Sequence, residues 1–114
     1  MPLVETLGHA KRRTTFAYEG TTETGIVLTG QGNLRVRATL FDAALKAFKG
    51  KTIRAGFSMT EPHPDGLGAW IAANSKALNG RKLTSRHGSF IAAILVHEGR
   101  LRHKLEGNTL YLEF

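Results

Sequence analysis

The chain has 114 residues and no cysteine, and its 16 Lys and Arg against nine Asp and Glu give a formal net charge of +7. This length suits one domain with its own core. The lack of cysteine excludes disulfides and thiolate zinc sites and favours a reducing compartment. No apolar run approaches the roughly 18 residues of a membrane span or resembles a signal peptide. We therefore expect a cytoplasmic, microbial protein whose positive charge serves a polyanionic partner, most often nucleic acid.

The chain divides into a short arm and one domain. Residues 1–13 have no clear hydrophobic period and end in three cations, so we expect a flexible basic arm before a single domain over residues 14–114. Phe16 and Tyr18 then share one face of a short strand. A second apolar run leads into a glycine-containing turn at residues 29–33, which predicts a hairpin.

An alternating stretch follows at residues 33–41. Its period of two predicts a half-buried strand with an apolar face formed by Leu34, Val36, Ala38 and Leu40. Asp42 is expected to cap a short helix that ends at Gly50. Residues 51–59 alternate again, which predicts another strand.

The last half of the chain predicts two helices and a hairpin. Asp65 follows a proline-rich loop and is expected to cap a helix with an inward stripe of Leu67, Trp70, Ile71, Asn74 and Leu78. After a turn, Thr84 or Ser85 is expected to cap a second helix, which ends at Gly99 and has a core stripe of Phe90, Ile91, Ile94 and Leu95. Residues 100–114 have the pattern of a terminal β-hairpin.

These elements define an α+β fold, with a small, mostly antiparallel sheet and about three helices. Its last third runs helix, turn, helix, β-hairpin. Winged-helix domains share that order, and in them the second helix enters the major groove while the hairpin touches the DNA backbone. The similarity is one of element order alone, and no motif of a particular family accompanies it. We expect one core containing Leu34, Val36, Ile53, Phe57, Trp70, Ile94, Leu95 and Leu112.

Cations recur on the polar faces of the predicted strands, at Arg35, Arg37, Arg54, Arg100, Arg102 and Lys104. Phosphate binding needs several long cationic side chains on one surface, because each neutralised phosphate releases counterions. Arg also offers a bidentate fork. The alternative is that half-buried strands simply place polar residues outside, and that cations on an edge strand prevent aggregation.

A second candidate contact lies around the start of the second predicted helix, at Arg81, Lys82, Ser85, Arg86, His87 and Ser89. Free N–H groups and hydroxyls at a helix N-terminus suit a phosphate. Ser85, Arg86 and Ser89 would also reach base edges if the helix lay in a groove. The alternative is ordinary capping with a solvated first turn.

The sequence offers little for catalysis. Glu61, His63 and Asp65 lie two apart in a proline-stiffened loop, where carboxylates and an imidazole could bind a metal or act as acid and base. No second cluster completes this set, and the five histidines lack metal-ligand spacing. A polar loop in which Asp65 caps a helix is the simpler interpretation. We therefore expect no catalytic residue, no metal and no cofactor.

The sequence favours a non-enzymatic module that binds double-stranded DNA through a basic surface, with more backbone contacts than base readout. DNA is favoured over RNA, and no membrane partner is expected. Two alternatives remain open. One is a small nuclease or other nucleic-acid-processing enzyme that uses His63, Asp65 and His87. The other is an interaction or immunity-type module that docks onto an acidic protein.

Overall fold

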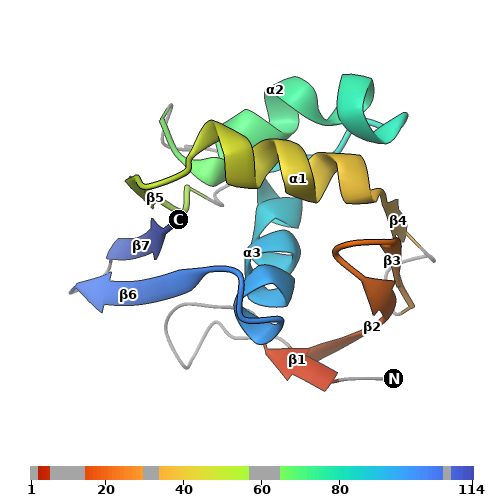
Figure 1. Cartoon of the computed structure of the whole chain (residues 1–114), viewed down its shortest axis with the longest axis horizontal. Helices are drawn as coiled ribbons and strands as arrows, with labels where there is room; N and C mark the ends of the chain where they lie inside the picture. Colours follow the sequence, from red (N-terminus) through yellow and green to blue (C-terminus); the bar gives the residue numbers. More distant parts are fainter. Residues whose placement is uncertain (1–2, 6–14, 30–33, 57–64, 107–108) are drawn as a thin grey trace.

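The computed structural model describes residues 3–5, 15–29, 34–56, 65–106 and 109–114. As the sequence predicts, the fold is α+β, with three helices and two antiparallel sheets. Helix α3 (Gly88–His97) lies between the two sheets, and helices α1 (Ala38–Ala47) and α2 (Leu67–Asn79) cover one end (Figure 1). Within the described ranges, no helix has the length and apolar character needed to span a bilayer.

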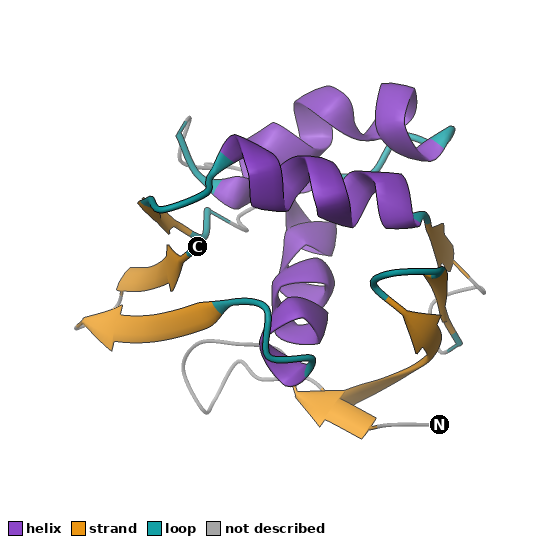
Figure 2. Ribbon diagram, viewed as in Figure 1, coloured by secondary structure: helices purple, strands orange, loops and turns teal. Residues whose placement is uncertain are grey.

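The N-terminal sheet has the strand order β1-β2-β3-β4, and all its neighbours are antiparallel (Figure 2). Its strands are β1 (Leu3–Glu5), β2 (Thr15–Thr21), β3 (Gly25–Leu28) and β4 (Leu34–Val36). Strand β1 falls within the segment expected to be an arm and pairs with the start of β2. The rest of that segment lies outside the described residues. The predicted hairpin is present as β3 and β4, although most of its turn is also outside them.

The prediction of one strand over residues 33–41 is wrong, because β4 ends at Val36 and α1 begins at Ala38. Asp42 therefore lies inside the helix with an exposed side chain, instead of capping it. The apolar residues that follow Ala38 have helical as well as alternating spacing, and in α1 they bury Leu40, Phe41 and Ala44. Hydrogen bonds from Asn79 of α2 to the backbone of Arg35 and Arg37 favour the helix over a longer strand.

The C-terminal sheet confirms the predicted hairpin and adds a third strand. Strands β6 (Arg102–Glu106) and β7 (Thr109–Glu113) pair antiparallel, and β5 (Thr52–Arg54) pairs with the other side of β7, so the order is β5-β7-β6. The predicted strand over residues 51–59 is thus shorter, and its last residues, from Phe57 on, lie outside the described part of the chain.

The predicted caps of the last two helices are wrong. Gly66, and not Asp65, is the N-cap residue of α2, and it forms no side-chain cap hydrogen bond. A short 3-10 turn (Ser85–His87) precedes α3, so that His87 occupies the N-cap position. The Nδ1 atom of His87 accepts the backbone N–H of Thr84 at 3.0 Å. The imidazole therefore closes the turn before α3, and no side-chain hydrogen bond caps the helix itself.

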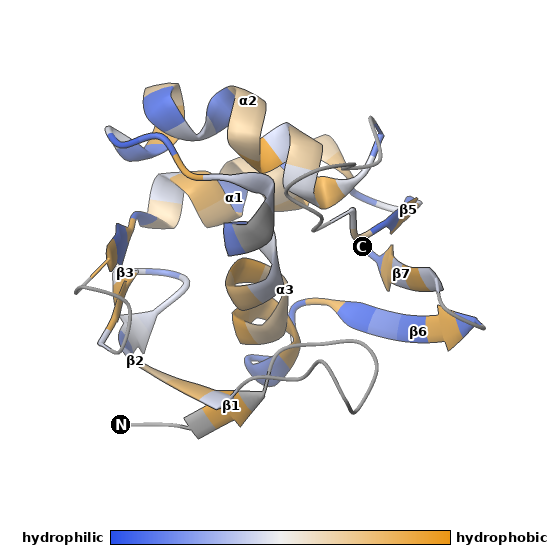
Figure 3. Cartoon of the chain, turned by 180° about the vertical axis from the view of Figure 1, so that it is seen from behind, coloured by the Kyte–Doolittle hydropathy of each residue, from blue (hydrophilic) through white to orange (hydrophobic). Residues whose placement is uncertain are grey.

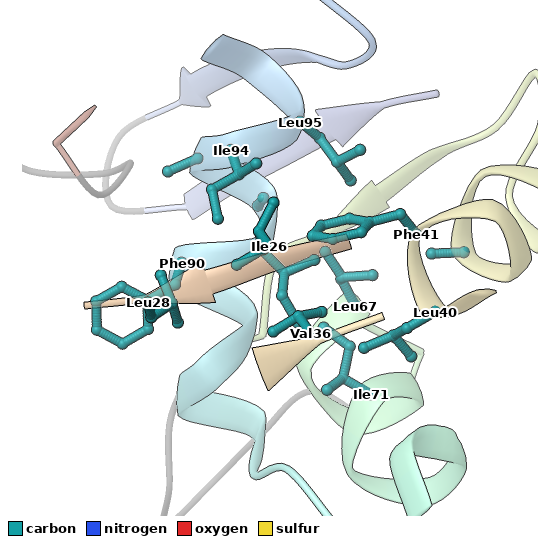
Figure 4. Close-up of a cluster of buried hydrophobic side chains, with 14 of the residues drawn as sticks. Ile26, Leu28, Val36, Leu40, Phe41, Leu67, Ile71, Phe90, Ile94 and Leu95 are labelled. Atoms are coloured by element: carbon teal, nitrogen blue, oxygen red, sulfur yellow. The ribbon is translucent and has the colours of Figure 1, made fainter. Parts of the chain in front are cut away.

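One core joins the two sheets and the helices, and α3 forms its centre (Figure 4). Every residue from Phe90 to Leu95 is buried. The predicted core is confirmed at Leu34, Val36, Ile94, Leu95 and Leu112, with Ile53 and Trp70 half-buried against it. Because the middle of α3 is buried on all sides, its residues from Phe90 to Leu95 have no side chains free to read a DNA groove. The similarity to winged-helix domains is therefore not confirmed.

A carboxylate ties the N-terminal sheet to the end of α3. Glu98 accepts hydrogen bonds from the Tyr18 hydroxyl at 2.9 Å and from the backbone N–H and hydroxyl of Thr22 at 3.0 and 2.9 Å. Tyr18 and Thr22 are buried. Burial, reinforced by the hydrogen bond and the charge of Glu98, raises the pKa of Tyr18 well above its ordinary value. The neutral phenol is thus part of the packed structure.

Candidate nucleic-acid interface

Seven of the cations selected from the sequence as contact residues lie in two regions at opposite ends of the molecule (Figure 1). We call the first the basic corner, which consists of Arg35, Arg37, Arg81 and Lys82. We call the second the C-terminal sheet face, which carries Arg54, Arg102 and Lys104. All seven residues are exposed. The two regions differ in how their cations are supported and neutralised.

Asn79, the last residue of α2, holds the two sides of the basic corner together. Asn79 is 5% exposed, and its side chain donates to the carbonyl of Arg35 at 3.0 Å and accepts the backbone N–H of Arg37 at 2.7 Å. It thereby satisfies two outward backbone groups at the end of β4, as a neighbouring strand would. These two hydrogen bonds lie where β4 ends, beside the C-terminal end of α2. They bring Arg35 and Arg37 next to the segment that carries Arg81 and Lys82.

The guanidinium of Arg37 lies over Gly80. This glycine follows α2 with φ +75°, and a Cβ atom there would come within 3.1 Å of Arg37 Nη2. The left-handed conformation favours glycine here, and a side chain would require the guanidinium of Arg37 to shift by a few tenths of an ångström. The last carbonyls of a helix carry partial negative charge, so a cation here stabilises α2 by about 0.3–1 kcal/mol. Arg37 therefore has a structural role as well as an exposed charge.

The loop after α2 is short because Leu83 anchors it. Leu83 is buried, and its N–H donates to the hydroxyl of buried Ser75 at 2.7 Å. Arg81 and Lys82 lie between this anchor and Gly80, and both are exposed. Lys76 is an exposed cation in the last turn of α2 that was not selected from the sequence. Its position one helical turn before Gly80 is the signal that would have added it to this group.

The basic corner keeps its charge. Among the described residues, none of its four cations forms an ion pair. Glu19 occupies the row of Arg35 two strands away, a separation of roughly 9–10 Å at the usual strand spacing. Several unpaired cations from two chain segments thus gather at one corner of the fold, where they can act together on a polyanion.

The C-terminal sheet face is more nearly neutral. Its three cations share the face with two acids, Glu106 and Glu113. Lys104 Nζ lies 2.8 Å from Glu106 Oε1, and the hydrogen bond and charge of Glu106 raise the pKa of Lys104. Arg102 lies directly opposite Glu113 in the β6–β7 register. This face therefore has little net charge to offer a phosphate.

Several other predicted contact residues are engaged elsewhere. Arg100 donates to the Thr22 hydroxyl at 2.9 Å and lies 3.9 Å from Asp42. Ser85 is buried against the start of α2, and His87 closes the turn before α3. Ser89 is half-buried. The side chain of Arg86 lies outside what the structure describes. The start of α3 therefore forms no exposed cluster of hydroxyls on the described side chains.

An open depression of about 410 Å³ lies beside the C-terminal sheet. Its lining includes three cations and one acid, Lys51, Arg100, Arg102 and Glu113. With Arg100 already bound and Glu113 opposite Arg102, the depression offers only Lys51 as a cation without an ion pair to a described residue. It adds nothing to the case for a separate anion site.

The loop considered for catalysis lies mostly outside the described residues, which include Asp65 but neither Glu61 nor His63. Among the residues that are described, no three of His, Cys, Asp and Glu are grouped so that they could hold a metal ion.

No family model, no curated protein and no solved structure matches this chain. The case for a function therefore depends on the chemistry of its surface.

Proposed function

We propose that this protein is a non-enzymatic module that binds the phosphate backbone of double-stranded DNA through the basic corner. The observation that carries the proposal is the meeting of Arg35, Arg37, Arg81 and Lys82 at one corner, without an ion pair to any described residue. Lys76 extends this group along α2. We place the activity in the cytoplasm, as the composition suggests.

Duplex DNA fits this surface better than a single strand, because single-strand binding uses exposed aromatic rings on which bases stack. Here five of the described aromatic rings pack against one another, and Tyr111 on the C-terminal sheet face is half-buried. Phe16 meets Phe90 at 5.0 Å between ring centroids, and Phe48 meets Trp70 at 5.8 Å and Phe114 at 5.2 Å. A duplex backbone needs only correctly placed cations.

The same geometry favours backbone contacts over base readout. The buried middle of α3 has no side chains to present to a groove. On α2 the exposed residues are Ala73, Lys76 and Ala77, and of these only Lys76 carries a polar group. We therefore expect similar affinities for unrelated duplex sequences.

Salt dependence gives the first test. Four phosphate contacts predict a slope of about −3.6 in a plot of log affinity against log salt, at about −0.9 for each contact. Between about 50 and about 200 mM salt, affinity should then fall by about 100-fold. We would measure this by fluorescence anisotropy with two unrelated duplexes, and with the matching single strand and an RNA duplex for comparison.

Single substitutions locate the site. Arg35→Gln, Arg81→Gln and Lys82→Gln should each weaken binding and flatten the salt slope by about one unit. Lys46→Gln, on an exposed position of α1, removes the same charge and should have a smaller effect. Arg54→Gln and Arg102→Gln test the C-terminal sheet face. If Lys46→Gln weakens binding as much as Arg81→Gln, the attraction is diffuse and the basic corner is not a site.

Other outcomes would replace the proposal. A protein that binds no duplex at about 50 mM salt is not a DNA-binding module. Cleavage that requires magnesium and disappears in His63→Ala would establish the enzyme alternative. Capture of one acidic protein, without DNA binding, would establish the interaction alternative.

A further inference from the structure

Strand β6 is an open edge. It pairs with β7 on one side, and no described strand pairs with its other side. All five of its residues are exposed, although they alternate between the two faces of the sheet. The outward N–H and C=O groups of such a strand are free to pair with another chain. Figure 3 shows the strand as mostly hydrophilic, with an apolar segment at the end of its arrow.

That apolar segment contains Leu105, which is 41% exposed and is the one exposed large hydrophobic residue in the described part of the chain. Leu105 lies opposite Leu110 of β7. Leu110 is half-buried against the core. Leu105 thus extends the apolar face of the C-terminal sheet to its outer edge, where nothing described covers it. A second strand that continued this row would bury it.

We propose that β6 pairs antiparallel with β6 of a second copy of this chain, about a two-fold axis through Leu105. Leu105 then lies opposite its own counterpart, and Lys104 of each copy lies opposite Glu106 of the other. The apolar row becomes Leu110, Leu105, Leu105, Leu110 across four strands. The two three-stranded sheets become one sheet of six strands.

The charges of β6 select this register over its neighbours. A two-fold axis at Lys104 would pair Arg102 with Glu106 but would place Lys104 opposite itself and Leu105 opposite His103. An axis at His103 would place Arg102 opposite Lys104. Directly opposed like charges are destabilising, and opposite charges stabilise a cross-strand pair by roughly 0.2–1 kcal/mol. Only the axis at Leu105 gives two opposite-charge pairs and one apolar pair. The Lys104–Glu106 pair within one chain is exposed, so its partners can exchange at small cost.

The dimer is independent of the proposed DNA binding. The basic corner lies at the other end of the molecule from β6 (Figure 1), so pairing through this edge leaves it uncovered in both copies. The oligomeric state can accordingly be measured without DNA, and its outcome leaves the DNA proposal untouched.

The test is sedimentation velocity of the full chain without DNA, from about 1 μM to about 1 mM. The expected mass rises with concentration from 12.4 kDa to twice that value. In the Lys104→Glu variant, two carboxylates face each other in each cross-strand pair, so this variant should remain monomeric. In the Glu106→Lys variant, two ammonium groups face each other in each pair, so this variant should also remain monomeric. A mixture of the two variants should dimerise, because each cross-strand pair between unlike copies again joins one carboxylate to one ammonium group.

Two exposed controls make the same changes of net charge away from β6, namely Lys46→Glu on α1 and Glu19→Lys on β2. Both should dimerise like the parent chain. A parent that stays at the monomer mass at every concentration overturns the proposal. So does a pair of edge variants that dimerise as well as the parent. If the parent dimerises but the mixture does not, the axis does not pass through Leu105.

Discussion

Strands β4 and β6 are both edge strands of antiparallel sheets, and both carry exposed cations. At β4 the side chain of Asn79 bonds the outward backbone groups, and α1 begins two residues later. At β6 the described residues offer no second partner, and every side chain is exposed. One edge is closed by the fold, and the other is open.

The contrast separates two uses of positive charge. Cations on an open edge discourage unwanted strand pairing, and at β6 Lys104 is paired with Glu106 of the same strand while Arg102 lies opposite Glu113 of β7. A closed edge needs no such protection, so that explanation does not account for Arg35 and Arg37. This contrast supports the proposals that the basic corner binds a polyanion and that β6 pairs with β6 of a second copy of this chain.

The largest effect is expected from a substitution in α3, because this helix packs against both sheets and its loss would disturb both regions. Ile94 is fully buried in α3. Ile94→Ala should lower the free energy of unfolding by about 2–5 kcal/mol through the cavity it leaves. Urea denaturation measures the change, with half-buried Val96→Ala as the milder control. An Ile94→Ala protein as stable as its parent would show that α3 is not the common support.

A smaller effect should follow from opening the closed edge. Asn79→Ala leaves the Arg35 carbonyl and the Arg37 N–H without their partner, at a cost of about 1–3 kcal/mol. Asn74→Ala is the matched control, since among the described residues the Asn74 side chain bonds the Trp70 carbonyl alone, within α2. Equal denaturation midpoints for the two variants would mean that Asn79 does not hold the corner together.

Alkaline pH should weaken the N-terminal side of the molecule through Tyr18. Its pKa is raised in the folded protein, so its contribution to stability is complete below about pH 10, the ordinary pKa of tyrosine. Above that pH the unfolded chain loses the proton while the folded protein keeps it. Stability then falls by up to about 1.4 kcal/mol for each pH unit from this group.

Denaturation midpoints between about pH 8 and about pH 12, a range that spans the ordinary tyrosine pKa, test this expectation. Tyr18→Phe should be less stable than the parent at neutral pH and should lose less stability as the pH rises. Tyr111→Phe removes the other tyrosine and is the control. If the denaturation midpoints of Tyr18→Phe and the parent fall in parallel with rising pH, Tyr18 is not the source of the alkaline loss of stability.

The smallest effect is expected at the open edge. Lys104→Ala removes an exposed ion pair with Glu106, and exposed pairs contribute little because water and salt screen them. In dilute protein, below the concentration at which dimers form, its thermal midpoint should match that of the parent. A clear loss of stability in dilute protein would mean that β6 depends on supporting contacts of the kind found at β4.

Much of the fold follows from the sequence alone. The α+β class, α2, the buried α3 and the terminal hairpin were all predicted, because hydrophobic period, length and turn residues are local properties. The four cations of the basic corner were also selected from the sequence. They were assigned to two separate clusters, however, since nothing local relates Arg35 to Arg81.

The tertiary structure decided where those residues meet. The end of β4, the start of α1 and the place of Arg37 depend on Asn79 and Gly80, which lie more than 40 positions away along the chain. The placing of Glu113 opposite Arg102 depends on strand register, and the loss of Arg100 as a free cation depends on Thr22 and Asp42. A residue's type and spacing determine its local conformation. The neighbours that satisfy or neutralise it are set only when the chain folds.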